Sequence, residues 1–304
     1  MMFGTREAFE YMECADCGCV QLLNVPADLS PHYPSEYYAY QQQETGQLKK
    51  LVRRVLDPQR AKYALAGGSL VGQLADRVLG TPESFTWLKQ TDTTFSDRIL
   101  DIGCGVGLLL QQLDRMGFEH LTGVDPFLER DLFYRPNFTV WKRELDDLEG
   151  TFDLVMMHHV FEHMADPAAV LTAVRRKLDR DGWLLIRIPV ASSEAYETYG
   201  PDWVALDAPR HLFLHTYESM RRLAEATGFT VEHTKSDAMP LQFIGSEQYR
   251  KGIPLMDERS HVKAPNASIF SAAQLADFER RTAELNAQHR GDAAAFYLRR
   301  TDAE

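Results

Sequence analysis

The sequence predicts an α/β fold: a Rossmann-like, doubly wound, mostly parallel sheet of seven strands. Two observations carry this prediction. Short apolar segments alternate with helical patterns in strict order from about Ser96 to His233, as in a right-handed parallel sheet. A glycine-rich turn follows the first of these segments, and such a turn brings backbone N–H groups against a ligand. We expect an N-terminal knuckle and helical cap before the sheet, and a C-terminal helical extension after it.

The glycine turn lies within Arg98 to Gly107, an apolar strand that ends in an acid and then in glycines at every second position. A dinucleotide-binding turn reads G-x-G-x-x-G and holds a pyrophosphate at the helix start. The spacing found here differs from that fingerprint, and Asp101 precedes the glycines. The turn therefore indicates a ligand other than a dinucleotide.

A second acid-tipped strand, Leu121 to Asp125, follows. The two oxygens of the Asp125 carboxylate can accept both ribose hydroxyls of a nucleoside. The alternative is that Asp125 only forms a turn before Pro126. Three further strands are expected at Phe138 to Leu145, Phe152 to Met157 and Trp183 to Ile188. Between the last two, Asp166 caps a helix that we expect to end at Asp181-Gly182.

Three segments resemble the class I S-adenosylmethionine-dependent methyltransferases: Asp101 to Gly107, Asp153 to Pro167, and Pro209-Arg-His-Leu212. The branch they resemble contains ubiquinone-type O-methyltransferases and bacterial sugar and polysaccharide methyltransferases. The resemblance implies S-adenosylmethionine as cofactor and a small-molecule or glycan acceptor, such as a sugar nucleotide or surface-polysaccharide unit, methylated on O or C. The implied cofactor-binding residues are Asp101, Gly103, Cys104, Gly105, Gly107, Asp125, Pro126, Glu144, Leu145 and His158. The rival functions are a non-catalytic cofactor-binding scaffold and an NAD-dependent oxidoreductase.

Candidate catalytic residues follow the fourth strand. If the segment from His159 starts a helix, then His159, Glu162 and His163 share one face. Two imidazoles around a carboxylate suit general base catalysis near neutral pH. Some relatives hold a divalent metal on this segment, and a purely structural role is the third alternative. The resemblance also places the loop of His211 near the acceptor, which makes His211 the best single candidate for the base.

The N-terminal residues contain Cys14, Cys17 and Cys19, which are typical of one knuckle of a zinc ribbon. A second cysteine pair would have to precede Met1. Either Cys19 and a distant histidine complete a zinc site, or the chain starts late relative to its relatives, or the knuckle is a metal-free remnant. The tyrosine-rich segment from Tyr33 to Tyr40 is either a lid over the site or packing for the N-terminal arm.

We divide the chain into a partial zinc-ribbon-like arm at 1–40, a helical cap at 41–92, a cofactor-binding core at 93–235 and a C-terminal extension at 236–304. A short apolar run from Ala294 to Leu298 could join the sheet. In the insertion after the fifth strand, Tyr199 and Trp203 either form walls for a sugar-like acceptor or anchor the loop.

The composition limits the partners. The chain has 33 Lys and Arg against 44 Asp and Glu, a net charge of −11, which disfavours a nucleic-acid substrate. No run of about 18 apolar residues indicates a membrane span. We therefore expect a cytoplasmic protein that binds neither nucleic acid nor a membrane; the sequence does not indicate an oligomeric state.

Overall fold

The central sheet has eight strands in the order β10-β11-β8-β7-β3-β4-β6-β5. The structure is a computed structural model that describes residues 2–5, 7–33, 47–80 and 83–301. Pairing is parallel from β6 through β4, β3 and β7 to β8, whereas β11 and β5 are antiparallel to their neighbours. The strands are β3 (Arg98–Ile102), β4 (His120–Val124), β5 (Leu132–Arg135), β6 (Phe138–Trp141), β7 (Phe152–His158), β8 (Leu178–Pro189), β10 (Phe229–Ser236) and β11 (Ala293–Arg300).

The mostly parallel, doubly wound sheet is as predicted, but the expected count of seven strands was wrong. The additional strand is β5, which pairs with β6 as an antiparallel hairpin at the sheet edge. Its turn contains Pro136 and Asn137, and Asn137 has the left-handed φ of 64° that asparagine tolerates in turns. The apolar run from Ala294 to Leu298 does join the sheet, within β11.

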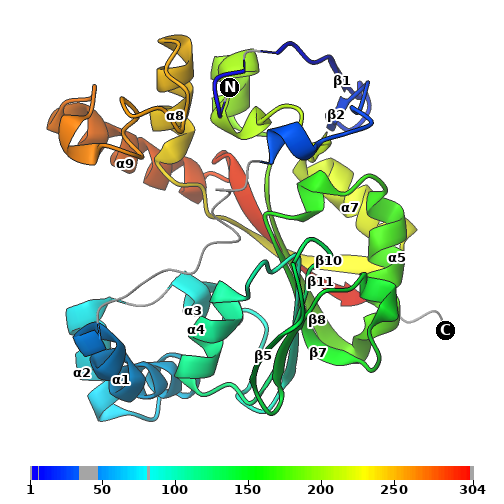
Figure 1. Cartoon of the computed structure of the whole chain (residues 1–304), viewed down its shortest axis with the longest axis vertical. Coiled ribbons are helices and arrows are strands. Elements are labelled where there is room, and N and C mark those ends of the chain that lie inside the picture. Colours follow the sequence, from blue (N-terminus) through cyan, green and yellow to red (C-terminus); the bar gives the residue numbers. More distant parts are fainter. Residues whose placement is uncertain (1, 6, 34–46, 81–82, 302–304) are drawn as a thin grey trace.

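Helices cover both faces of the sheet (Figure 1). One face packs against α4 and, beyond it, against the N-terminal helices, with Phe85, Leu110 and Leu113 in its core. The other packs against α5 and α7 through Leu171 and Met220. The helices are α1 (Gln47–Ala66), α2 (Leu70–Leu79), α3 (Glu83–Leu88), α4 (Leu108–Met116), α5 (Pro167–Lys177), α6 (Glu194–Tyr199), α7 (Tyr217–Ala226), α8 (Leu241–Arg250) and α9 (Ala272–Ala287).

A third core lies between the insertion after β8 and the C-terminal helices α8 and α9, and contains Trp203, Phe243 and Phe278. Short 3-10 helices connect the larger elements: η1 (Ser30–His32), η3 (Leu145–Asp147), η4 (Phe161–His163), η5 (Gly200–Asp202), η6 (Val204–Leu206) and η7 (Pro265–Ala267). The chain then returns to the sheet as β11, so residue 235 does not separate the sheet from the C-terminal extension.

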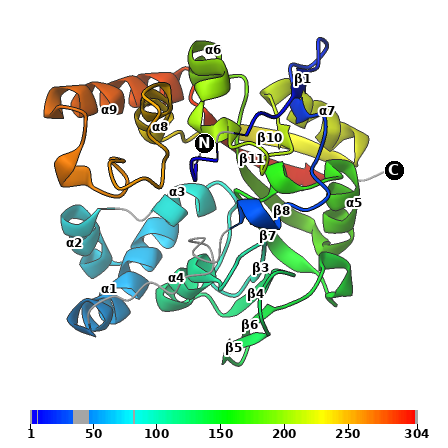
Figure 2. The same cartoon turned by 45° about the horizontal axis from the view of Figure 1, so that its top comes forward.

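The N-terminal arm forms a small second sheet with the main domain. Strands β1 (Tyr11–Glu13) and β2 (Val20–Leu22) make a hairpin, and β2 pairs with β9 (Phe213–Leu214). The hairpin lies beside α7 in both views (Figures 1 and 2). Thr216 Oγ1 donates a hydrogen bond to the Cys17 carbonyl at 2.6 Å, which connects the turn between β1 and β2, here called the cysteine turn, to the start of α7.

Three predicted boundaries were wrong. Helix α5 ends at Lys177 rather than at Asp181-Gly182, because Leu178 is extended and already pairs with Phe152 of β7. Strand β8 therefore starts at Leu178 instead of Trp183. The strand expected from Phe138 to Leu145 stops at Trp141, and Leu145 begins η3.

Candidate functional site

The glycine turn between β3 and α4 requires glycine at its bends. Gly103, Gly105 and Gly107 have φ values of 68°, 54° and 71°, in the left-handed region that other residues rarely occupy. A Cβ on Gly103 would lie 2.6 Å from both γ-methyl groups of Val160. The turn therefore leaves its backbone bare at the C-terminal edge of the sheet, and it packs directly against the segment that follows β7.

Asp125 braces this turn. Its Oδ2 accepts the Gly105 N–H at 2.9 Å, and its Oδ1 accepts the Phe127 N–H at 2.9 Å. Asp125 therefore does stabilise the turn before Phe127, as the alternative prediction stated. Each carboxylate oxygen can accept a further hydrogen bond, so ribose recognition stays compatible with it. Asp101 is buried beside it, and burial together with the negative charge of Asp125 raises the pKa of Asp101 to about 8.

The other expected cofactor residues lie around the turn in different ways. The Cys104 thiol faces β4, because a Cβ on Gly123 would come within 2.5 Å of its Sγ. Pro126 is half-buried after β4, Glu144 is exposed before η3, and Leu145 packs against the sheet core. His158 ends β7 and packs on the Trp87 ring, with ring centroids 4.8 Å apart.

The segment after β7 is not the helix that would place His159, Glu162 and His163 on one face. His159 has a left-handed φ of 54°, and only Phe161–His163 form a single 3-10 turn, η4. The side chains nevertheless meet, since His159 Nδ1 lies 3.6 Å from Glu162 Oε1. The tight turn after β7, rather than helical spacing, brings them together.

His211 joins this group from the insertion after β8. Its Nε2 lies 3.9 Å from Glu162 Oε1, and its ring centroid lies 4.8 Å from that of His163. The Leu212 N–H donates to the Glu162 carbonyl at 2.8 Å, which fixes the two loops together. Glu162, His163 and His211 can each direct one ligand atom to a common point, with these atoms within 4.8 Å of one another. We call these three residues the Glu–His cluster.

Backbone carbonyls fix the protonation of both imidazoles. The Nδ1 atom of His211 lies 2.7 Å from the Ala205 oxygen, and that of His163 lies 2.8 Å from the Arg210 oxygen. A carbonyl only accepts, so each Nδ1 carries the proton and donates it. When the ring is neutral, Nε2 then keeps a lone pair, and in His211 that atom is the one nearest Glu162.

Burial and charge set the state of the cluster. Burial alone would raise the pKa of Glu162, but the nearby His159 imidazole and the charges of His163 and His211 outweigh it, and the pKa falls to about 2. Burial, and then repulsion from His163, lowers the pKa of His211 to about 4. At pH 7, therefore, Glu162 is ionised and His211 is neutral. Both Glu162 oxygens are buried without a hydrogen-bond partner among the described residues.

Two residues that support His211 were missed by the sequence analysis. Tyr11 of β1 donates to the His211 carbonyl at 2.9 Å, and no sequence signal connects positions 200 residues apart. Asp207 Oδ2 lies 3.8 Å from His211 Nε2. This acid precedes the histidine by four positions, which was a visible signal.

Tyr199, Trp203 and His215 are each held by a contact outside the Glu–His cluster. Trp203 is 1% exposed, and its Nε1 donates to Asp292 Oδ2 at 2.8 Å. Tyr199 donates to Glu247 Oε1 at 3.0 Å. Of the two alternatives for this pair, the structure supports anchoring of the loop. His215 is buried next to the N-cap of α7, where its Nδ1 lies 3.2 Å from Ser219 Oγ.

The cysteine turn joins β1 to β2, and Cys14, Cys17 and Cys19 are free thiols. Cys19 Sγ lies 3.9 Å from His215 Nδ1, so a distant histidine is close to one thiol. Within the described part of the chain, however, the cysteines belong to no set of three or more converging metal ligands. The geometry therefore does not fit a four-ligand zinc site, and zinc at this knuckle stays a prediction from sequence.

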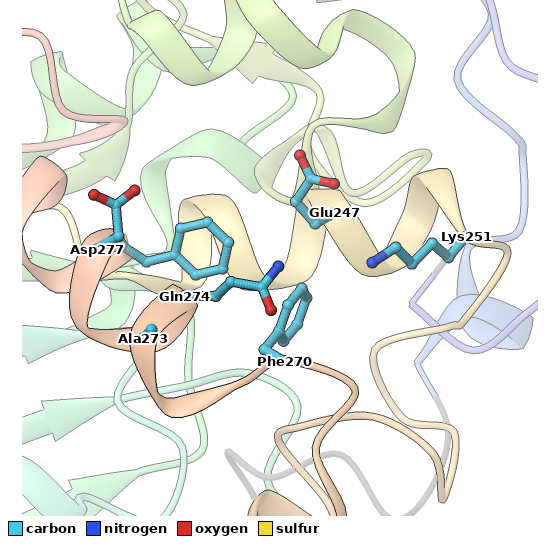
Figure 3. Close-up of a pocket in the computed structure, with 7 residues that line it drawn as sticks. Glu247, Lys251, Phe270, Ala273, Gln274 and Asp277 are labelled. Atoms are coloured by element: carbon cyan, nitrogen blue, oxygen red, sulfur yellow. The ribbon is translucent and has the colours of Figure 1, made fainter.

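A cavity of about 480 Å³ opens between α8 and α9, away from the glycine turn. Figure 3 shows Glu247 of α8 and Lys251, the residue directly after α8, on one side of the cavity and Phe270 and Gln274 on the other. None of the residues predicted to bind the cofactor or to act in catalysis lines this cavity.

A family model described as a methyltransferase domain matches residues 40–234. The chain belongs to this methyltransferase family. The matched range includes the glycine turn, Asp125 and the Glu–His cluster, so the motifs that predicted the fold also carry the family assignment. The family and its curated relatives support S-adenosylmethionine as the cofactor.

Two curated relatives illustrate the range of similarity. The ubiquinone biosynthesis O-methyltransferase of Albidiferax ferrireducens is 25% identical over 162 residues, covering 49% of this chain and 63% of the relative. The enzyme of that name from Cereibacter sphaeroides is 33% identical over 149 residues, covering 44% of this chain and 56% of the relative. The chain thus spans less than two thirds of either relative's length.

One similar solved structure is that of an S-adenosylmethionine dependent methyltransferase from Mesorhizobium loti. Its TM-score is 0.41 and its identity 17%, and the match covers 67% of this chain and 91% of that one. Another is an O-methyltransferase from a Brevibacillus brevis multienzyme in complex with S-adenosyl-L-homocysteine. Its TM-score is 0.46 and its identity 13%, with 79% of each chain covered.

The residues of the turn fit the cofactor. The glycines place no side chain between the cofactor and the backbone, although the N–H groups of Gly103, Gly105 and Gly107 already donate to Val124, Asp125 and Cys104. The Asp125 carboxylate contacts this turn, where its two oxygens suit the ribose hydroxyls of a nucleoside. The glycine turn and Asp125 are therefore chemically consistent with the cofactor, and the other cofactor-binding residues stay predictions.

Proposed function

We propose that the chain is an S-adenosylmethionine-dependent O-methyltransferase that acts on a hydroxyl group of a small molecule. The observation that carries the proposal is the direct packing of the Glu–His cluster segment on the glycine turn, through Val160 and Gly103. Methyl transfer requires the two reactants to be held in line and in contact. A general base next to the cofactor turn is the arrangement that this reaction needs.

When bound, S-adenosylmethionine would supply an electrophilic methyl group on a positively charged sulfur, and that sulfur would leave as a neutral thioether when its bond to the methyl carbon breaks. His211 Nε2 takes the proton of the acceptor hydroxyl while the new carbon–oxygen bond forms. The Ala205 carbonyl holds His211 in the tautomer with the lone pair on Nε2. The Glu162 carboxylate, 3.9 Å from that atom, stabilises the imidazolium that results.

The same cluster also fits a divalent cation. Glu162 offers two buried oxygens without hydrogen-bond partners among the described residues, and both histidines donate Nδ1–H to carbonyls, as metal-ligating histidines do. A cation held there would lower the pKa of a hydroxyl bound to it. Two imidazoles favour zinc, manganese or iron over magnesium.

The acceptor class follows from two sources. The sequence resemblance favours a sugar nucleotide or surface-polysaccharide unit, and the curated relatives are named for ubiquinone biosynthesis. We propose a hydroxylated acceptor of one of these two classes, sugar or phenol. His159 is about half exposed and His163 is half-buried, with the Tyr33 hydroxyl 3.2 Å from His163 Nδ1.

The proposal is tested by incubating the chain with labelled methyl donor and a panel of sugar nucleotides and phenols, and by calorimetry with S-adenosylhomocysteine. The wild-type chain should bind the homocysteine product and label one class. His211→Ala should be at least about 100-fold slower with unchanged product affinity, whereas His120→Ala, an exposed histidine on β4, should match the wild type.

Other outcomes would replace the proposal. Product binding without labelling of any acceptor would support the scaffold alternative, and heat with NAD but not with the methyl donor would support an oxidoreductase. Loss of activity on chelation that a divalent metal restores would assign the cluster to a cation rather than to a free base.

A further inference from the structure

Helix α2 exposes a continuous row of large apolar side chains, which we call the apolar row. It consists of Leu70, Val71, Leu74 and Val78, with exposed fractions of 86%, 59%, 65% and 76%. Three of the four are spaced by four residues, so they lie on one side of the helix. Single exposed apolar residues are common on protein surfaces, but a contiguous row marks an interaction site.

The opposite side of α2 packs against α1. Gly72 and Ala75 are buried, and a Cβ on Gly72 would lie 2.0 Å from the Gln59 carbonyl oxygen of α1. Ser69 caps the helix by accepting the Gly72 N–H at 3.0 Å and also donates to Gln59 Oε1. The glycine contact fixes α2 on α1 with the apolar row outward. Figure 1 shows this helix pair at the periphery, beyond α4.

The helix pair also differs in charge from the rest of the chain. Helices α1 and α2 contain seven Lys or Arg residues and two Asp residues, a net of +5, whereas the whole chain carries −11. Lys62 and Arg77 are exposed among the described side chains. In this acidic protein, a basic helix pair therefore also carries the apolar row.

We infer that the α1–α2 pair docks on the surface of an anionic lipid bilayer. A helix that lies in a membrane interface has apolar side chains on one face and Lys or Arg beside them. Each cation near an anionic leaflet contributes to the attraction. No helix among the described residues is long and apolar enough to cross a membrane. The sequence analysis expected no membrane partner because it considered only spanning segments, but lying on a surface requires only an amphipathic face.

Charge favours an anionic bilayer over a second copy of the chain as the surface that covers the apolar row. A twofold contact through the apolar row would bring the same basic segment of each copy against the other, and like charges in contact are unfavourable. An anionic lipid surface covers the apolar row and neutralises the cations together. An acidic protein is the competing occupant, and in that case the wild type should not bind anionic vesicles.

The test is co-sedimentation of the full chain with vesicles. The wild type should bind phosphatidylcholine vesicles that contain phosphatidylglycerol, and it should not bind vesicles of phosphatidylcholine alone. Leu70→Ser/Leu74→Ser should reduce the partition coefficient at least about tenfold, because two leucines no longer insert. Lys62→Glu/Arg77→Glu should reduce it by a similar factor, and higher salt should weaken wild-type binding.

Val262→Ser is the matched control, since Val262 is 48% exposed and lies in the C-terminal region; it should bind as the wild type does. Failure of the wild type to bind the anionic vesicles would overturn the inference, as would equal binding by the double-leucine variant. Light scattering that shows a wild-type dimer dissociated by Leu70→Ser/Leu74→Ser would assign the row to a second copy. Because the charge-reversal variant keeps every apolar contact, it tests the inference even if the leucine variant misfolds.

Discussion

Asp101 and Glu162 are both buried carboxyls at the same edge of the sheet, yet they have opposite charge states. Asp101 has Asp125 as its charged neighbour, so burial and repulsion act together, and its pKa rises to about 8. Glu162 has imidazoles around it, and its pKa falls to about 2. The first carboxyl is therefore largely neutral at pH 7 and the second is ionised.

Asp101→Asn should change how stability depends on pH. A carboxyl whose pKa rises from 3.8 in the unfolded chain to about 8 in the folded one stabilises the fold at low pH. This contribution is fully present below pH 3.8, falls as the pH rises from 3.8 to about 8, and is gone above that. The variant should therefore exceed the wild type in free energy of unfolding by at least ~1 kcal/mol at pH 8, and match it near pH 4.

Urea unfolding at both pH values measures the effect. Glu119→Gln, an exposed carboxyl beside β4, should leave the pH dependence as in the wild type. If Asp101→Asn and the wild type lose stability in parallel as the pH rises, Asp101 is not the protonated group that the geometry indicates.

Individual site residues differ in how far the sequence predicts them. Gly103 and Asp125 belong to a local motif, where a strand, a turn and the next strand follow at short distances. His163 and His211 were also named, but their convergence on Glu162 depends on an insertion that folds back over the sheet edge. Tyr11 carries no signal at all, because its contact with His211 spans the length of the chain.

At the scale of single elements, the N-terminal hairpin supports the catalytic loop rather than forming a separate unit. Leu22 donates from its N–H to the Leu212 carbonyl at 2.9 Å, and Tyr11 donates to the His211 carbonyl at 2.9 Å. These bonds hold the carbonyls of two consecutive residues, His211 and Leu212. The hairpin therefore positions the loop that carries the proposed base.

Tyr11→Phe should reduce turnover without weakening cofactor binding. The variant keeps the ring and loses one partly buried hydrogen bond. Such a bond contributes about 1 kcal/mol, which corresponds to about fivefold in rate if all of it serves to position His211. Steady-state kinetics should show a lower kcat at an unchanged affinity for S-adenosylhomocysteine. Tyr63→Phe, on α1, is the control. An unchanged kcat in Tyr11→Phe would show that the hairpin does not position His211.

Elements with local signals were predicted best. Asp166 accepts the Ala169 N–H at 2.9 Å and Pro167 opens α5, as the sequence indicates, and Thr216 caps α7. Strand β5 was missed because its four residues are only partly buried at the sheet edge. The end of α5 was misplaced because Gly182, a turn signal in sequence, lies inside β8.

At the scale of the whole molecule, the last strand completes a sheet that begins near residue 98. Strand β11 lies between β8 and β10 and pairs with both. Its residues Ala294 to Leu298 are each 0% exposed. The chain must therefore be made almost to its end before the central sheet can close, even though the family match stops at residue 234.

Truncation before Ala293 should abolish cooperative folding. Burying Phe296, Tyr297 and Leu298 contributes about 1.5–3 kcal/mol each, and their sum approaches the ~5–15 kcal/mol by which a whole protein is stable. Removing β11 also leaves one edge of β8 and one edge of β10 without their backbone partners. Thermal unfolding followed by circular dichroism should show no cooperative transition for this truncation. A chain that ends at Thr301, which keeps all of β11, should unfold as the full-length protein does; a cooperative transition without β11 would mean that β8 and β10 can close the sheet directly.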